Sequence, residues 1–313
     1  MTSKKKFSFI DLFAGIGGIR LAFERSGCEC VFSSEWDVFA QKTYLANFGE
    51  TPAGDITKID AKEIPPFDIL TAGFPCQPFS SIGKRQGFMH ATQGTLFYDV
   101  LRIIKHHMPK AFLLENVPGL KTHDGGNTFR IILEALDEVG YKVFHSVLDA
   151  ADFGVPQQRK RIYIVGFRKD LIGDLGFSFP VGKADKSYIC DYLEKDAVGY
   201  SISKRLQNGY MKKKDDGRPM LVDRSSKVQV KTLVATYHKI QRLTGTFVKD
   251  GETGMRLFTV AECKAIMGFP KDFVFPVSRT QMYRQMGNSV AVPAVQAVAR
   301  QIVDKLMIIS KEK

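Results

Sequence analysis

The chain has 313 residues, enough for a large hydrophobic core and for more than one domain. Hydrophobic residues make up 44% of it, and 45 Lys and Arg against 33 Asp and Glu give a net charge of +12. The sequence has no run of about 20 uncharged apolar residues, and Asp11 cuts short the apolar start, which argues against a membrane span and a signal peptide.

Short apolar runs alternate with stretches of helical periodicity over the first half of the chain. In chain order we expect strand 7–14, helix 19–27, strand 30–36, helix 37–49, strand 67–75, helix 95–107, strand 110–117, helix 128–140, and strands 142–150 and 160–168. This alternation predicts an α/β fold, with a doubly wound, mostly parallel sheet and helices on both of its faces.

The pattern changes after Pro180. Residues 181–256 are polar, basic and punctuated by glycine, which predicts a smaller, irregular region. Helical patterns return at 259–270 and 289–309, and the second is so apolar that we expect it to pack back on the first sheet.

The basic charge is concentrated in one part of the chain. Residues 200–256 hold 13 Lys and Arg against five Asp and Glu, a net charge of +8 in under a fifth of the sequence. A charge run is often only a solvated face, but one as concentrated as this favours a polyanionic partner.

The cysteines and histidines form no metal-binding pattern. The five cysteines include no CxxC pair, and Cys28 and Cys30 are too close together for ordinary zinc-ligand spacing. The six histidines show no ligand spacing either. We therefore expect no metal site, and thiols that stay reduced in a cytosol.

A glycine-rich turn follows the first expected strand. Gly15, Gly17 and Gly18 stand between that strand and the next helix, where a doubly wound sheet binds nucleotide-like ligands. Glu35 ends the second strand, where an acid can accept hydrogen bonds from ribose hydroxyls, and Asp55 lies further on. Because the turn has no lysine, an adenosine-bearing cofactor fits better than a free phosphate. The alternative is a tight turn without a ligand.

Two further reactive side chains follow strands at the same carboxyl edge. The prolines around Cys76, in GFPCQPFS, keep this residue out of a helix or a central strand. Four apolar residues precede Glu115, so burial would raise the pKa of its carboxyl group and let it donate a proton. A nucleophile, an acid and a cofactor turn are thus expected together. An inert buried thiol and a helix-capping acid are the alternatives.

Six motifs occur in an order that is highly specific. They are DLFAGIGG (11–18), GFPCQPFS (73–80), ENV (115–117), QQRKRIYIVGF (157–167), RLFTVAECKAIMGFP (256–270) and QMGNSV (285–290). With them the chain resembles the bacterial cytosine-C5 DNA methyltransferases of restriction–modification systems. Only residues from about 181 to 255 match loosely, and there the family carries its variable target-recognition region.

The resemblance implies methyl transfer from S-adenosyl-L-methionine to C5 of a cytosine that is flipped out of duplex DNA. The Cys76 thiolate would add to C6 of the base, and Glu115 would hold N3 and the exocyclic amine. Arg159 and Arg161 match the arginines of the active site, where a cationic neighbour favours the thiolate.

The resemblance also implies binding residues and a division into domains. The cofactor contacts would be Phe13, Gly15, Gly17, Gly18, Glu35, Trp36, Asp55, Ile56, Pro75, Leu96 and Asn288. Ser80, Lys84 and Arg85 match a loop that closes over DNA. The expected parts are a catalytic and cofactor-binding domain at 1–180, a target-recognition domain at 181–270, and a C-terminal segment at 271–313 that packs on the catalytic domain.

The recognition segment is expected at residues 232–251. Lys239, Gln241 and Arg242 are the side chains expected to reach DNA there, because Arg and Gln can make bidentate contacts to guanine and adenine. The alternative is that they contact only phosphates. Thr244 matches a family threonine near the DNA backbone.

Two other functions compete with DNA methylation. A tRNA cytosine methyltransferase would share the chemistry, but the Cys-Phe-Thr signature of that branch is missing and the basic region suits duplex DNA. A catalytically inactive binding module would not need Cys76, ENV and the glycine turn. We therefore expect a monomer that acts on double-stranded DNA in a bacterial cytoplasm, without a membrane. It would protect host DNA from a cognate restriction endonuclease without forming a stable complex with it.

Overall fold

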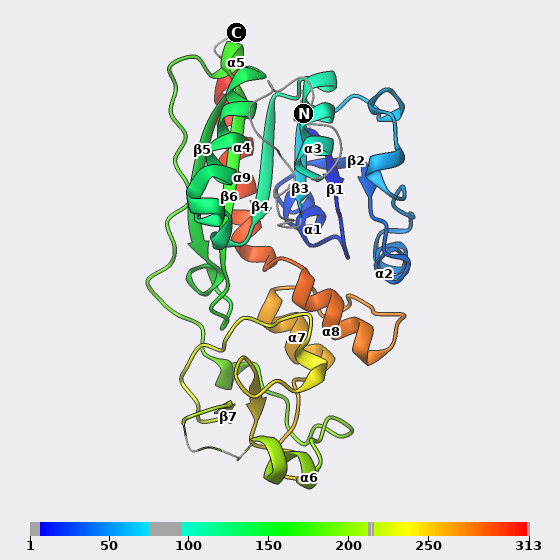
Figure 1. Ribbon diagram of the computed structural model, residues 1–313, viewed down its shortest axis with the longest axis vertical. Helices are drawn as coiled ribbons and strands as arrows, with labels where there is room; N and C mark the ends of the chain where they lie inside the picture. The colour runs from blue at the N-terminus through cyan, green and yellow to red at the C-terminus, as the bar shows by residue number, and fades with distance from the viewer. Residues whose placement is uncertain (1–6, 75–95, 212–213, 215, 312–313) are drawn as a thin grey trace, which may run out of the picture.

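The structure is a computed structural model that describes residues 7–74, 96–211, 214 and 216–311. Within these residues the main strands are β1 (Ser8–Leu12), β2 (Glu29–Ser34), β3 (Ile69–Gly73), β4 (Ala111–Asn116), β5 (Tyr141–Asp149) and β6 (Lys160–Arg168). They form one sheet in the order β2-β1-β3-β4-β6-β5 (Figure 1). β6 runs antiparallel to both of its neighbours, β4 and β5, and the other neighbouring strands in this sheet are parallel, so the prediction of a mostly parallel sheet is confirmed.

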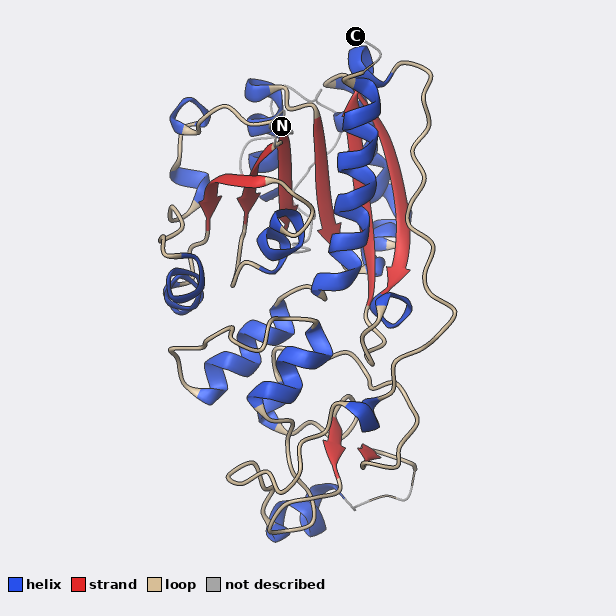
Figure 2. Ribbon diagram, turned by 180° about the vertical axis from the view of Figure 1, so that it is seen from behind, coloured by secondary structure: helices blue, strands red, loops and turns tan. Residues whose placement is uncertain are grey.

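Helices cover both faces of this sheet, as Figures 1 and 2 show from opposite sides. They are α1 (Gly18–Glu24), α2 (Val38–Phe48), α3 (Leu96–His107), α4 (Asn127–Glu138) and α9 (Val292–Ile309). Neighbouring strand residues enter different cores, since side chains alternate across a strand. Phe9 and Leu113 pack in the core that contains α1 and α9, whereas Ile10 and Leu114 pack in the core that contains α3 and α4.

The helix α8 (Arg279–Asn288) was missed by the sequence patterns. It is mostly polar, and only Met282, Tyr283, Gln285 and Met286 are buried, so the apolar periodicity that reveals other helices is weak. The available signal was Ser278, whose side chain accepts a hydrogen bond from the N–H of Gln281 and caps the helix.

The region below the sheet in Figure 1 contains little regular structure. Its short elements include α6 (Lys204–Leu206), β7 (Met220–Val222) and β8 (Thr246–Val248), and the helix α7 (Val260–Met267) follows. The fully buried Arg256 joins this region to α7, because its guanidinium lies 2.8 Å and 2.9 Å from the two carboxylate oxygens of Glu262. Removing one partner of such a buried pair costs about 3–5 kcal/mol.

The C-terminal helix α9 returns to the first part of the chain. It packs along α1, and residues such as Val295, Val298 and Ile302 are fully buried in the same core as the strand residues Phe9 and Val165. Among the described residues, no helix is both long and apolar enough to cross a lipid bilayer.

Candidate active site and cofactor cavity

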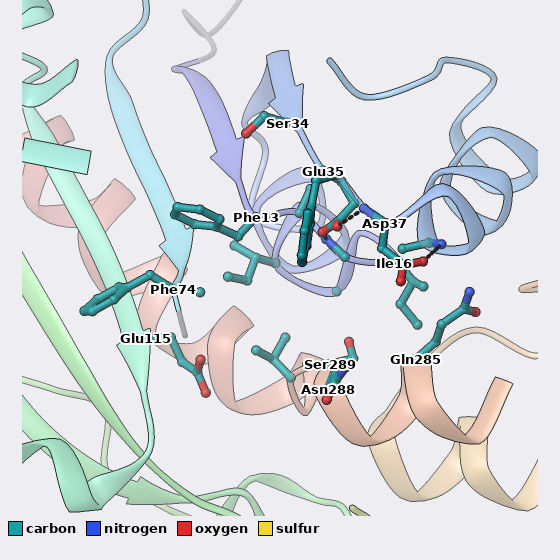
Figure 3. Close-up of a pocket in the computed structure, with 18 of the residues that line it drawn as sticks. Phe13, Ile16, Ser34, Glu35, Asp37, Phe74, Glu115, Gln285, Asn288 and Ser289 are labelled. Atoms are coloured by element: carbon teal, nitrogen blue, oxygen red, sulfur yellow. Dashed lines mark hydrogen bonds between the residues drawn. The ribbon is translucent and has the colours of Figure 1, made fainter. Parts of the chain in front are cut away.

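A cavity of about 680 Å³ opens at the carboxyl ends of β1, β2, β3 and β4. The strand order reverses at β1, which has β2 on one side and β3 on the other, and ligands bind doubly wound sheets at such switch points. Residues at the end of α8 form the opposite wall (Figure 3). The cavity thus combines the glycine turn, the acids that end strands, and the QMGNSV motif.

Glu35 anchors the glycine turn from the end of β2. The Gly15 N–H donates to Glu35 Oε2 at 2.8 Å, and the Asp37 N–H donates to Glu35 Oε1 at 2.7 Å (Figure 3). Burial raises the pKa of Glu35, although these backbone hydrogen bonds oppose the shift. Each carboxylate oxygen retains a free lone pair, so the side chain can hold the turn and still accept a hydroxyl donor.

Most residues expected to contact the cofactor line this cavity. They are Phe13, Gly15, Gly18, Glu35, Trp36, Asp55, Ile56, Leu96 and Asn288. Trp36 is 77% exposed, which leaves an aromatic face open to a ligand. Gly17 is not part of the lining. It has a φ of 83°, and a Cβ there would lie 2.2 Å from the ring of Phe48, so this glycine is required for packing.

Two residues that line the cavity carry buried polar atoms without partners. Gln285 lines it and is 7% exposed, and its Oε1 accepts from the Thr43 hydroxyl at 2.9 Å, yet its Nε2 has no partner among the described residues. Ser34 also lines the cavity, and its buried hydroxyl is likewise unpaired in this part of the chain. Both atoms are shielded from the cavity, so these unpaired groups do not identify a ligand.

The other end of the cavity holds a buried acid and two arginines. Glu115 ends β4, and its Oε1 lies 3.0 Å from Arg161 Nε. Burial raises the pKa of Glu115 despite the two cations nearby, so the carboxyl holds its proton to a higher pH than an exposed glutamic acid does. The pair comes from adjacent antiparallel strands, β4 and β6, so their register sets its geometry.

Arg159 lies deeper and is 3% exposed. Its Nη1 donates to the carbonyl of Leu233 at 3.0 Å, and its Nη2 donates to the carbonyls of Gly287 and Ser289. Burial lowers its pKa to about 9, so it stays protonated at neutral pH. Arg159 lines the cavity, but its Nε is shielded and has no partner within the described chain.

Asn116 controls how the chain leaves β3. Its Nδ2 donates to the carbonyl of Phe74 at 2.9 Å, and its Oδ1 accepts from the Val117 N–H at 2.8 Å. The sequence reasoning did not single out this residue, although it is the middle letter of ENV. Gly73 pairs in register with Glu115, so the end of β3 lies beside the buried acid.

Five of the expected site residues lie outside the described residues. They are Pro75, Cys76, Ser80, Lys84 and Arg85. The four described cysteines do not line the cavity. Burial raises the pKa of Cys28 and of Cys30 to about 12, which leaves little thiolate at neutral pH. No cluster of His, Cys, Asp and Glu suited to a metal ion occurs in the described part of the chain.

The segment expected to recognise DNA, residues 232–251, presents three of its four expected DNA contacts to solvent. Lys239, Gln241 and Thr244 are exposed, and Gln241 Oε1 accepts from the Thr244 hydroxyl at 3.2 Å. Arg242 differs from the expectation because it is 7% exposed. Its guanidinium donates to the carbonyls of Met211 and Lys214 and pairs with Asp216, so it is occupied in holding a neighbouring turn.

Comparisons with known proteins agree on one family. The model of the C-5 cytosine-specific DNA methylase family matches residues 7–304. The type II methyltransferase M.MspI of Moraxella sp. is 62% identical over 296 residues, which cover 95% of this chain and 70% of that protein. M.BsuFI of Bacillus subtilis, also a type II methyltransferase, is 62% identical over 304 residues, covering 97% of this chain and 74% of its own.

Solved structures share the fold at lower identity. The Entamoeba histolytica methyltransferase EhMeth has a TM-score of 0.74 at 23% identity, covering 97% of this chain and 99% of its own. The Dnmt2 methyltransferase of S. pombe has a TM-score of 0.75 at 22% identity, covering 96% and 99%. Together with the site, the family match identifies the chain as an enzyme and excludes an inactive binding module. The chain belongs to the family of C-5 cytosine-specific DNA methylases.

Proposed function

We propose that this methylase transfers the methyl group of S-adenosyl-L-methionine to C5 of one cytosine within a short sequence of duplex DNA, with Cys76 as the nucleophile. The observation that carries the proposal is the cavity itself. One end has the glycine turn held by Glu35, and the other has the buried Glu115 and Arg161 beside the end of β3. The chain enters the segment with Cys76 from Phe74 and leaves it at Leu96, and both residues line this cavity.

The residues of the chain supply acid and nucleophile to the base. Cys76 adds as a thiolate to C6 of the cytosine, which makes C5 electron-rich. Glu115, whose pKa is raised by burial, protonates N3 as C6 is attacked and so stabilises the adduct. Arg161 orients the Glu115 carboxyl. Once C5 carries the methyl group, loss of the C5 proton and of the thiolate, with return of the N3 proton to Glu115, restores the aromatic ring. Because C6 is inaccessible in the stack, the base must first leave the duplex.

S-adenosyl-L-methionine fits the lining residues and supplies the electrophilic methyl group. Glu35 would accept the ribose hydroxyls, Trp36 would stack on the adenine, and Asp55 would bind near the nucleoside, while Asn288 would bind at the α8 wall.

DNA would be bound by the basic region and by the segment around Cys76. The proposed recognition residues are Lys239, Gln241 and Thr244, and Ser80, Lys84 and Arg85 are the proposed DNA contacts of a loop that closes over the duplex. Arg242 is not proposed as a DNA contact, because its guanidinium is bound within the protein.

The proposed domains are 1–180 for catalysis and cofactor binding, 181–270 for target recognition, and 271–313 for the segment that packs on the catalytic domain. We also propose a monomer of the bacterial cytoplasm that protects DNA from a cognate endonuclease.

A methyl-transfer assay tests this function. The enzyme is incubated with tritiated S-adenosyl-L-methionine and either duplex DNA or tRNA, and bisulfite sequencing of the DNA then maps the modified cytosine. We expect label in DNA alone, at one recurring sequence. Label in tRNA and not in DNA would overturn the proposal and favour the tRNA methyltransferase.

Replacing Glu35 should weaken cofactor binding through the ribose. We expect Glu35→Ala to raise the Kd for S-adenosylhomocysteine by about 10–150-fold, since a charge-assisted hydrogen bond contributes about 1.5–3 kcal/mol. Titration calorimetry with S-adenosylhomocysteine and with its 2′- and 3′-deoxy analogues separates the two roles of Glu35. The wild type should bind S-adenosylhomocysteine more tightly than either deoxy analogue, and Glu35→Ala should bind all three with similar Kd values. Glu29→Ala, an exposed acid on the same strand, is the control. If Glu35→Ala still binds S-adenosylhomocysteine more tightly than the deoxy analogues, Glu35 holds the glycine turn but does not bind the ribose.

A further inference from the structure

The recognition segment begins against the wall of the cofactor cavity. Leu233, its second residue, is 3% exposed and has both of its peptide groups bound by side chains. Its N–H donates to Gln157 Oε1 at 2.7 Å, and its carbonyl accepts from Arg159 Nη1 at 3.0 Å. Gln157 and Arg159 stand two residues apart just before β6, so one short stretch of the catalytic region holds both sides of Leu233.

The same two side chains also bind α7 and the end of α8, which meet the recognition segment and the start of β6 at one junction. Gln157 Nε2 donates to the carbonyl of Ile266 in α7 at 3.2 Å. Arg159 Nη2 donates to the carbonyls of Gly287 and Ser289, which flank the proposed cofactor contact Asn288. Gln157 Nε2 also lies 3.0 Å from Met267 Sδ, and Gln157 is fully buried, so its hydrogen bonds form away from water.

Main chain packs directly on main chain at this junction. A Cβ at Gly287 would lie 2.0 Å from the backbone nitrogen of Ala235 and 2.2 Å from the carbonyl carbon of Val234. Neither atom can rotate away as a flexible side chain can. The recognition segment therefore lies in contact with the end of α8, and Figure 1 shows it in yellow beside α7 and α8.

We propose that Gln157 is a positioning residue that couples DNA sequence recognition to catalysis. Gln157 fixes the start of the recognition segment relative to Arg159, the carboxyl end of α8 and the cavity. The exposed residues Lys239, Gln241 and Thr244 then contact DNA at one fixed position along the duplex. A base sequence that the segment does not fit then shifts Leu233 and disturbs Arg159 through their shared hydrogen bond. The inference rests on the proposed roles of the recognition segment and of Arg159.

The test compares Gln157→Met with Gln158→Met in the full-length enzyme. Methionine keeps the length of the side chain at 157 but leaves the Leu233 N–H and the Ile266 carbonyl without their partners. Gln158 is the matched control, because its side chain is exposed and it bonds to Val230 and Thr232 only through its backbone. Single-turnover methyl transfer is measured on the duplex identified by bisulfite sequencing and on duplexes with single substitutions in that site.

We expect Gln157→Met to reduce the ratio of cognate to substituted rates by about tenfold, within the 5–150-fold range of coupling between sites. The Kd for S-adenosylhomocysteine should change by less than about threefold, because the amide does not line the cavity. Gln158→Met should keep the wild-type ratio. An equal loss on every duplex would mean that Gln157 only stabilises the fold, and would overturn the inference.

Hydrogen exchange in the wild type keeps the inference testable if Gln157→Met does not fold. The amide of Leu233 should be protected in the free enzyme, and cognate DNA should slow its exchange more than substituted DNA does. Rapid exchange at Leu233, or equal protection by both duplexes, would contradict the coupling. A wild type that transfers no methyl group to DNA would overturn the proposed function. An active wild type with unchanged discrimination in Gln157→Met would overturn only this inference.

Discussion

Cys76→Ser should reduce methyl transfer by about 10⁴-fold or more, the order seen when a catalytic nucleophile is removed. The serine hydroxyl is scarcely ionised at neutral pH, whereas a thiol beside cationic groups supplies thiolate. The affinity for DNA should survive, because the thiolate forms the covalent adduct and does not contribute to ground-state binding. Single-turnover transfer of tritiated methyl groups and a filter-binding assay measure the two quantities separately.

A mechanism-based trap checks the same residue directly. DNA with 5-fluorocytosine at the target position should trap the wild type covalently, because fluorine cannot leave C5 as a proton does. Cys76→Ser should form no adduct on a denaturing gel. Cys190→Ser is the matched control, since Cys190 is only partly buried and does not line the cavity. An adduct with Cys76→Ser would rule out Cys76 as the nucleophile.

Glu115→Gln should lower kcat by about 10²–10⁴-fold, the usual contribution of a general acid. Glutamine keeps the shape of the side chain and can still bond to the base, but it has no acidic proton to give to N3. It also leaves the charge of Arg161 without its carboxylate partner. Transfer is measured with DNA and cofactor at saturation, so that the change reports the chemical step, and the Kd for DNA should stay within about threefold.

Glu134→Gln is the control for this substitution. Glu134 also pairs with an arginine, Arg130 at 2.6 Å, but that pair is exposed on α4 and such surface pairs contribute little to stability. Its rate should equal that of the wild type. Thermal unfolding of both variants shows whether the loss at position 115 comes from chemistry or from folding. A folded Glu115→Gln enzyme with more than half of the wild-type kcat would contradict the acid role.

The order and type of the strands and helices around the central sheet follow from the sequence alone, whereas α8, which forms the opposite wall of the cavity, does not. Periodicity is a local property, so the apolar run before Glu115 and the helical pattern of 289–309 both predicted what the structure contains, β4 and α9. The glycine turn and Glu35 were also recognisable, because their spacing reflects the connection between β1 and β2. The ordered motifs predicted the family, and the family match confirms it.

Only the tertiary structure determines which of these side chains contact one another and which have hydrogen-bonding groups available to a ligand. The apolar pattern of β6 is the same in either direction, so its antiparallel pairing, which brings Arg161 to Glu115, could not be read from the sequence. Arg242 resembles a DNA-contacting arginine in the sequence, but in the fold Met211, Lys214 and Asp216 occupy its donors. The contacts of Gln157 with Leu233, 76 residues away, depend on the same non-local packing. Hydrogen-bond partners and burial are properties of the assembled fold, and no local period encodes them.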